Sequence, residues 1–186
     1  MKTLSQYQQF SHTTRSYDLT RPVDTNLKAK INRIIDANKD NFQYMFVLED
    51  KDIIEKVYQA SDIPDETGLG IHYTPRKNSQ ILAPLLILLV PHGNDHFGIY
   101  MAGKTYGNIG ITAIGAGYHT SFCICFDRDK TKEILGISPA HFISYGAVLM
   151  SVGYIAPGTS FQTDLRQNLV TESQVKNNIN YIKVFD

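Results

Sequence analysis

The sequence predicts an α+β fold, because helical and β-type segments follow one another without regular strand–helix–strand alternation. Residues 24–37 carry apolar side chains at helical spacing, and Asp24 or Thr25 can cap the helix that they predict. Residues 43–48 are aromatic and β-branched, which is typical of strands, and helical spacing returns over residues 50–60. The most apolar run, residues 81–90, has about half the length of a membrane-spanning helix and predicts a buried strand.

The second half of the chain continues in the same irregular order. Residues 99–117 are apolar but rich in glycine, so a helix there must gain stability from the close approach of another backbone or a flat ligand. Residues 61–79 are rich in proline, glycine and polar side chains and predict a long excursion over the surface, of a kind that often carries function. We further expect strands at residues 121–126, 142–154 and 181–185, and helices at residues 3–10 and 129–135.

Composition and charge narrow the classes of function. Apolar residues make up 42% of the 186 residues and charged residues 19%, so we expect one globular domain over residues 1–186. Lys plus Arg equals Asp plus Glu at 18 each, which disfavours nucleic acid and membrane partners. Cys123 and Cys125 are too close in sequence to staple the fold, and no secretory leader is evident. We therefore expect a cytoplasmic protein with reduced thiols.

Two local groups invite other interpretations. His92, Asp95 and His96 lie together, but no further cluster of ligands accompanies them, so we expect a turn and predict no metal. Cys123 and Cys125 would share one face of a strand, where two buried thiols are expected rather than a redox pair.

Separated short motifs carry a more specific signal. They are, in chain order, Ser11-His12-Thr13-Thr14-Arg15-Ser16-Tyr17 with Pro22-Val23; Asn41-Phe42-Gln43; Asn108, Gly117, Thr120 and Phe126-Asp127; Leu135-Gly136-Ile137; Val152-Gly153-Tyr154; and Arg166. In order and spacing they resemble the FMN-dependent nitroreductase superfamily along most of the chain. The sequence departs from that pattern at Ser11, where the family has arginine, and at Ile124 and Cys125, where it usually has glycines.

The resemblance implies a fold and an activity. The implied fold is a central, mostly antiparallel sheet flanked by helices, in a homodimer whose terminal segment is swapped onto the partner subunit. The apolar end at residues 181–185 suits such a swap, because a lone terminal strand needs an edge with which to pair. The implied activity is that of an FMN-dependent oxidoreductase: NAD(P)H gives a hydride to FMN and leaves, and a small electron acceptor such as a nitroaromatic or quinone then takes its place.

The resemblance also assigns residues to FMN. Arg15 would lie near the N1 and C2 oxygen edge of the ring or the ribityl chain, where a fixed cation stabilises the reduced flavin. Thr13 would supply a hydroxyl for the phosphate or ribityl end, and Arg166 would bind the phosphate. His12 or Lys183 can compensate for the missing cation at Ser11. Asn41 and Gln43 would bond the polar rim of the ring, and the backbone of Ile124 and Cys125 would pass its N5 atom.

Each assignment has a structural alternative. Arg15 can form a surface ion pair, Thr13 can cap a helix, and Arg166 can be solvated. Asn41 can end a helix and Gln43 can start a strand without touching a ligand. Two other functions therefore stay open: a non-catalytic flavin-binding or storage protein, and a degenerate homologue that binds no flavin. The sequence does not identify the acceptor or choose between NADH and NADPH.

Overall fold

The computed structural model describes residues 16–63, 76–93, 95–124, 126–141, 143 and 147–158. Its helices are α2 (Thr25–Asp36), α3 (Lys51–Gln59), α4 (His96–Gly115) and α5 (Arg128–Ile134), with short 3-10 turns η1 (Lys39–Asn41) and η2 (Ser79–Ile81). Its strands are β1 (Phe42–Leu48), β2 (Asp62–Ile63), β3 (Arg76–Lys77), β4 (Leu85–Pro91), β5 (His119–Cys123) and β6 (Leu149–Gly153). The expected α+β class is confirmed.

The centre of the fold is a four-stranded sheet in the order β1-β4-β6-β5. Each neighbouring pair is antiparallel, so the expected antiparallel sheet is confirmed as well. The start of β1, the end of β4, the start of β6 and the end of β5 consequently meet at one end of the sheet. Within the described residues β1 and β5 are its two edges, and β2 pairs separately with β3.

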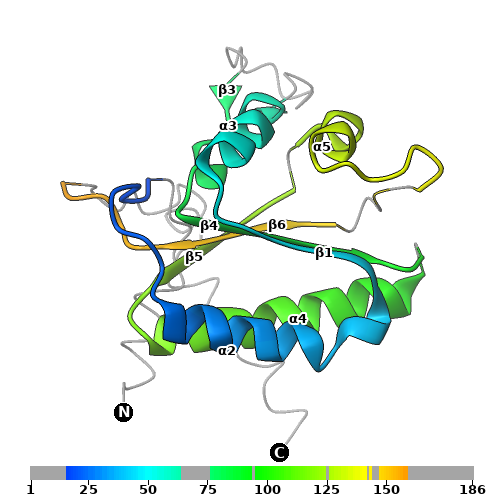
Figure 1. The fold of residues 1–186 in the computed structure, drawn as a ribbon, viewed down its shortest axis with the longest axis horizontal. Coiled ribbons are helices and arrows are strands. Elements are labelled where there is room, and N and C mark those ends of the chain that lie inside the picture. Colours follow the sequence, from blue (N-terminus) through cyan, green and yellow to red (C-terminus); the bar gives the residue numbers. More distant parts are fainter. Residues whose placement is uncertain are drawn as a thin grey trace, which may run out of the picture.

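Helices cover both faces of this sheet (Figure 1), with α2 and α4 on one face and α3 and α5 on the other. β4 is buried along its whole length because both of its faces are covered. Its side chains alternate between two apolar cores. Leu85, Ile87 and Leu89 join the core under α2 and α4, and Leu86, Leu88 and Val90 join the core under α3 and α5.

The helices begin at side-chain caps that the sequence contains. Asp24 caps α2, with its Oδ1 atom accepting a hydrogen bond of 2.8 Å from the Leu27 N–H. Asp50, Asp95 and Asp127 cap α3, α4 and α5 in the same way. Gly117, with φ of 89°, follows the end of α4 and permits the left-handed turn there. Asp95 thus has a structural use, as expected for this turn.

Three expected strands have different bounds. The strand expected at residues 81–90 begins only at Leu85, because residues 79–81 form η2 and Pro84 cannot donate a ladder hydrogen bond. The strand expected at residues 142–154 is confined, among described residues, to Leu149–Gly153, and that expected at residues 121–126 is β5. The expected helix at residues 3–10 and strand at residues 181–185 lie outside the described residues.

Candidate functional site

The Asn-Phe-Gln motif lies at the start of β1. Asn41 ends η1, is half-buried, and donates from Nδ2 to the Asn38 carbonyl at 3.0 Å. This hydrogen bond is the structural alternative to ligand contact that the sequence allowed for Asn41 at the end of a helix. It occupies one amide proton. The Oδ1 atom and the second amide proton form no hydrogen bond with the described part of the chain.

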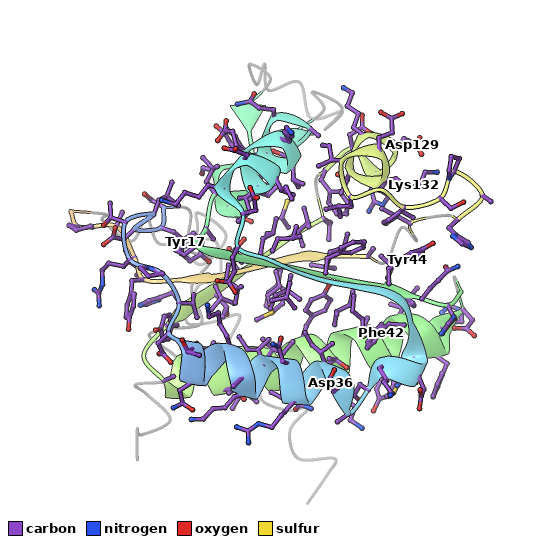
Figure 2. All side chains as sticks on the ribbon, viewed as in Figure 1. Tyr17, Asp36, Phe42, Tyr44, Asp129 and Lys132 are labelled. Carbon is purple, nitrogen blue, oxygen red and sulfur yellow. The ribbon has the colours of Figure 1, made fainter. Side chains whose placement is uncertain are left out.

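A β-bulge sets the position of Gln43. Phe42 pairs with Pro91 and Tyr44 with Val90, so β1 contains one extra residue at this point. Without the bulge Phe42 and Tyr44 would share a face, but Phe42 packs in the core under α2 and α4 while Tyr44 points to the opposite face (Figure 2). Gln43 is half-buried, and its carboxamide forms no hydrogen bond within the described residues.

The end of β5 approaches the same end of the sheet from the other edge. Ile124 follows β5 directly and its side chain is 61% exposed. Three strand spacings, about 14 Å in all, lie between the β1 and β5 edges. The register sets Cys123 level with Phe46, so Asn41 lies further along the strand direction than Ile124. Cys123 is buried, and its Sγ atom accepts a hydrogen bond of 2.8 Å from Asn78 Nδ2. Cys125 lies outside the described residues, and β5 ends at Cys123. The expectation that the two cysteines share one face of a strand therefore stays a prediction.

All of the expected phosphate and ribityl residues lie outside the described chain, namely Ser11, His12, Thr13, Arg15 and Arg166. The described residues of that N-terminal motif are Ser16, whose carbonyl accepts from the Ala156 N–H at 3.1 Å, and Tyr17, which forms a bridge with Ile155 just beyond β6. Its hydroxyl lies 2.8 Å from Ser121 Oγ in the buried interior. Tyr17 and Tyr44 therefore lie at opposite ends of the sheet (Figure 2), about 20 Å apart along a seven-residue strand.

The structure thus places Asn41 and Gln43 on the β1 edge and Ile124 on the β5 edge, toward the same end of the sheet, while Tyr17 lies at the other end. The donor set of Asn41 and Gln43 fits the ring of FMN, because two carboxamides with unused donors and acceptors match the alternating polar groups of a flavin rim. The described carboxamides of Asn41 and Gln43 therefore fit the ring of FMN.

A neighbouring polar pair was not evident from the sequence. The Tyr44 hydroxyl hydrogen-bonds His141 Nδ1, and the two rings meet edge to face with centroids 5.4 Å apart. This contact fixes the segment after α5 beside Gln43. The two residues are 97 positions apart, and only an alignment of related sequences could have paired them before the fold was known.

A second polar group anchors the opposite end of the sheet. The Tyr118 hydroxyl donates to Asp24 Oδ2 at 2.7 Å and accepts from the Asp24 N–H at 3.1 Å. Burial raises the pKa of Tyr118, and the hydrogen bond from Tyr118 lowers the pKa of the Asp24 carboxyl. Arg21 lies 3.6 Å from the ring centroid of Tyr154, which packs on Tyr118. This group is structural, because it ties the start of α2 to the ends of α4 and β6.

A cavity of about 280 Å³ opens near that anchored end, away from Asn41 and Gln43. Apolar side chains provide most of its lining, including Leu19, Pro22 and Ile54, and Glu49 at its rim is paired with Lys28 at 2.7 Å. Thr20, Lys51 and Glu55 also line this cavity. None of the residues that the sequence predicted for the site lines it, so we base the candidate site on the start of β1 instead.

No three His, Cys, Asp or Glu side chains of the described chain gather as a metal site would require. None of the described helices combines the length and the apolar character needed to cross a membrane.

Comparison with known proteins supports the fold. No family model and no curated protein matches the sequence. Among solved structures, an FMN-dependent nitroreductase from Clostridium difficile R20291 is similar with a TM-score of 0.60 and 14% identity, over 88% of this chain and 94% of that chain. A nitroreductase family protein from Clostridium difficile 630 has a TM-score of 0.62 and 13% identity, over 94% and 96%. A nitroreductase with bound FMN from Bacteroides fragilis has a TM-score of 0.60 and 13% identity, over 88% and 94%.

At such low identity the likeness concerns the fold. It confirms the resemblance that the spacing of the motifs indicated, and the chain therefore has the nitroreductase fold, in a divergent form.

Proposed function

We propose that the protein is an FMN-dependent oxidoreductase that takes a hydride from NAD(P)H and passes electrons to a small acceptor, working as a cytosolic homodimer. One observation carries the proposal. Residues whose order and spacing resemble the nitroreductase superfamily lie on a chain with the nitroreductase fold, and Asn41 and Gln43 present unused carboxamide groups together at the start of β1. Cys123 is buried and is not part of a disulfide, which is consistent with a reducing compartment.

The described residues would hold and orient the ring. Asn41 offers its Oδ1 atom and one amide proton, since the other proton is held by the Asn38 carbonyl. Gln43 is turned out of the ladder by the bulge and offers its whole carboxamide. The backbone beyond β5 at Ile124 would line the reactive edge. Arg15, Thr13, His12, Ser11, Cys125 and Arg166 complete the proposed site. FMN itself, when bound, supplies the hydride-accepting chemistry.

The first test is the visible absorption spectrum of the purified protein, alone and after addition of FMN. We expect the yellow spectrum of a bound flavin and a loss of about tenfold or more in FMN affinity for Asn41→Ala, because a polar group of the ring loses its partner. Asn32→Ala is the matched control, since Asn32 lies exposed on α2. Unfolding measurements on Asn41→Ala separate a lost ligand contact from the lost bond to Asn38. A protein that stays colourless with excess FMN contradicts the proposal and favours the flavin-free alternative.

The second test is anaerobic rapid mixing of the flavin-loaded protein with NADH and with NADPH. Bleaching of the bound flavin by either is the result expected of an enzyme. A non-catalytic flavin-binding protein is the second candidate, and the bulk of Ile124 favours it, because its 61% exposed side chain stands where the family usually has glycine. Ile124→Gly should then raise the rate of bleaching. If neither NADH nor NADPH bleaches the flavin of the wild type or of Ile124→Gly, the enzyme function is excluded and flavin binding alone stands.

The homodimer is proposed with the terminal segment at residues 181–185 paired to the partner subunit. β5 supports this arrangement, because it is an edge strand within the described residues and an edge exposes unpaired backbone groups. Sedimentation of a flavin-loaded species at the monomer mass of 21.0 kDa would contradict it.

A further inference from the structure

The cavity of about 280 Å³ lies at the end of the sheet opposite Asn41 and Gln43. Three segments line it, namely the loop before α2 at residues 19–22, the junction of β1 and α3 at residues 49–55, and the entry to β4 at residues 82–84. β1 is seven residues long and separates this cavity from Asn41 by roughly 20 Å. The cavity is therefore no part of the proposed flavin ring site.

The lining of the cavity offers apolar surface to a ligand. Ile54 and Ala83 are buried, and Leu82 and Pro84 are half-buried beside them. Leu19 also lines the cavity, and its side chain is 44% exposed. A leucine that stays exposed beside an apolar hollow has surface left to bury, and burial of that surface against a ligand stabilises the complex.

Hydrogen bonds hold the walls of the cavity in place. In the loop before α2, Asp18 Oδ1 accepts from the N–H of Thr20 at 3.0 Å and from its hydroxyl at 2.6 Å. The Asp18 N–H donates to the Tyr154 carbonyl at 2.9 Å, which ties this loop to the end of β6. On the side of β4, the Leu82 N–H donates to the Ser79 carbonyl at 3.3 Å. A site whose walls are held before the ligand arrives loses less conformational freedom on binding.

Three charged side chains line the cavity, and two of them are not used elsewhere in the described chain. Glu49 is paired with Lys28 at 2.7 Å. Lys51 and Glu55 lie one turn apart on α3, yet neither forms an ion pair with a described residue. Lysine before glutamate is the weaker order for a pair at this spacing, and the helix dipole disfavours a cation at the first position of α3, where Lys51 lies. These two charges therefore do little for the helix and are available to a ligand.

We propose that this cavity binds a free aliphatic α-amino acid, with its carboxylate at Lys51, its ammonium group at Glu55 and its side chain among Leu19, Ile54 and Leu82. The two charged groups of an α-amino acid share one carbon atom. Residues one turn apart on a helix have Cβ atoms about 5–6 Å apart, so a single zwitterion can meet both side chains. The site goes beyond the proposed oxidoreductase function and does not depend on it.

Size and charge both favour this class of ligand. Drug-sized ligands occupy pockets of about 300–1,000 Å³, so a cavity of about 280 Å³ suits a smaller molecule. At about 30 Å³ for each water molecule, it has room for a ligand of about nine non-hydrogen atoms, which is the size of free leucine. A purely apolar molecule would leave both charges unmet, and a simple amine or carboxylic acid would meet only one of them.

Titration of the isotopically labelled full chain with L-leucine, followed by NMR, tests the site. We expect saturable shifts of the backbone N–H signals of Leu19, Ile54 and Ala83, and none at Asn41 and Gln43. Isoamylamine lacks the carboxylate and isocaproate lacks the ammonium group, so each should bind about threefold or more weakly than leucine. Glycine lacks the apolar side chain and should bind about tenfold or more weakly. Absence of saturable shifts at the cavity, or equal binding of leucine and either singly charged analogue, overturns the inference.

Variants of the two charged residues test their roles one at a time. Lys51→Met and Glu55→Gln each remove one charge from an exposed side chain of similar length, so circular dichroism should not change. We expect each to raise the Kd for leucine about threefold or more, as the loss of an exposed ion pair would. Lys56→Met is the matched control, because Lys56 is exposed on the same helix and does not line this cavity. An unchanged Kd in Lys51→Met and Glu55→Gln, or an equal rise in all three variants, overturns the inference.

Discussion

Replacing Gly153 with alanine tests how closely the end of β6 is packed. A Cβ atom added there would lie 2.7 Å from Pro84 Cδ and 2.9 Å from Tyr17 Cδ1, closer than carbon atoms approach without displacement. Neither neighbour can move freely, because Pro84 is a rigid ring at the entry to β4 and the Tyr17 hydroxyl is held 2.8 Å from Ser121 Oγ. Overpacking of this kind costs about 1–3 kcal/mol.

We therefore expect Gly153→Ala to lower the free energy of unfolding by about 1–3 kcal/mol, which corresponds to roughly 2–12 °C in Tm for a chain of this length. Urea and thermal unfolding followed by circular dichroism measure the change. Gly110→Ala is the matched control, because its Cβ atom would make an ordinary contact of 3.7 Å with Met150 Cε inside α4. That variant should gain up to about 1 kcal/mol. A Gly153→Ala protein as stable as the wild type would refute the packing argument.

Two further predictions concern buried hydroxyl groups. The Tyr106 hydroxyl accepts from the Leu89 N–H at 2.8 Å and donates to the Val148 carbonyl at 2.5 Å. Tyr106→Phe should therefore lower the free energy of unfolding in urea by about 1–3 kcal/mol. An unchanged unfolding midpoint would contradict this. The hydrogen bond from Tyr118 holds the pKa of Asp24 below its ordinary 3.8. The stability that this hydrogen bond contributes is therefore complete above pH 3.8, and it is lost as the pH falls through the lower pKa of the folded state. The stability advantage of the wild type over Asp24→Asn should shrink below pH 3.8, and an advantage independent of pH would exclude this linkage.

Local chemistry made much of the fold predictable. Helix α2 was predicted almost to the residue, because Asp24 is a strong N-cap and Leu27, Ile31 and Ile35 repeat at helical spacing. The strand bounds were less accurate. Pro84 precedes β4, which begins only at Leu85, and Ile143 and Ala147 fill the core under α3 and α5 without joining a strand.

The candidate site was predictable only in part. The sequence pointed to Asn41 and Gln43 through their motif, but it contained no signal for the bulge that turns Phe42 and Tyr44 to opposite faces. A bulge depends on the register between β1 and β4, which is set by pairing between distant segments. The contact between Tyr44 and His141 depends on tertiary folding for the same reason.

The sequence by itself determined the α+β class, the helix caps and the spacing that resembles the nitroreductase superfamily, because these depend on neighbouring residues and their side chains. Only the tertiary structure decided that Asn41 and Ile124 lie toward one end of the sheet while Tyr17 lies at the other, and that Gly103 and Gly107 of α4 are exposed while Gly98 and Gly110 are buried. Strand order and the orientation of a helix follow from burying apolar surface contributed by the whole chain, and no local segment contains that information.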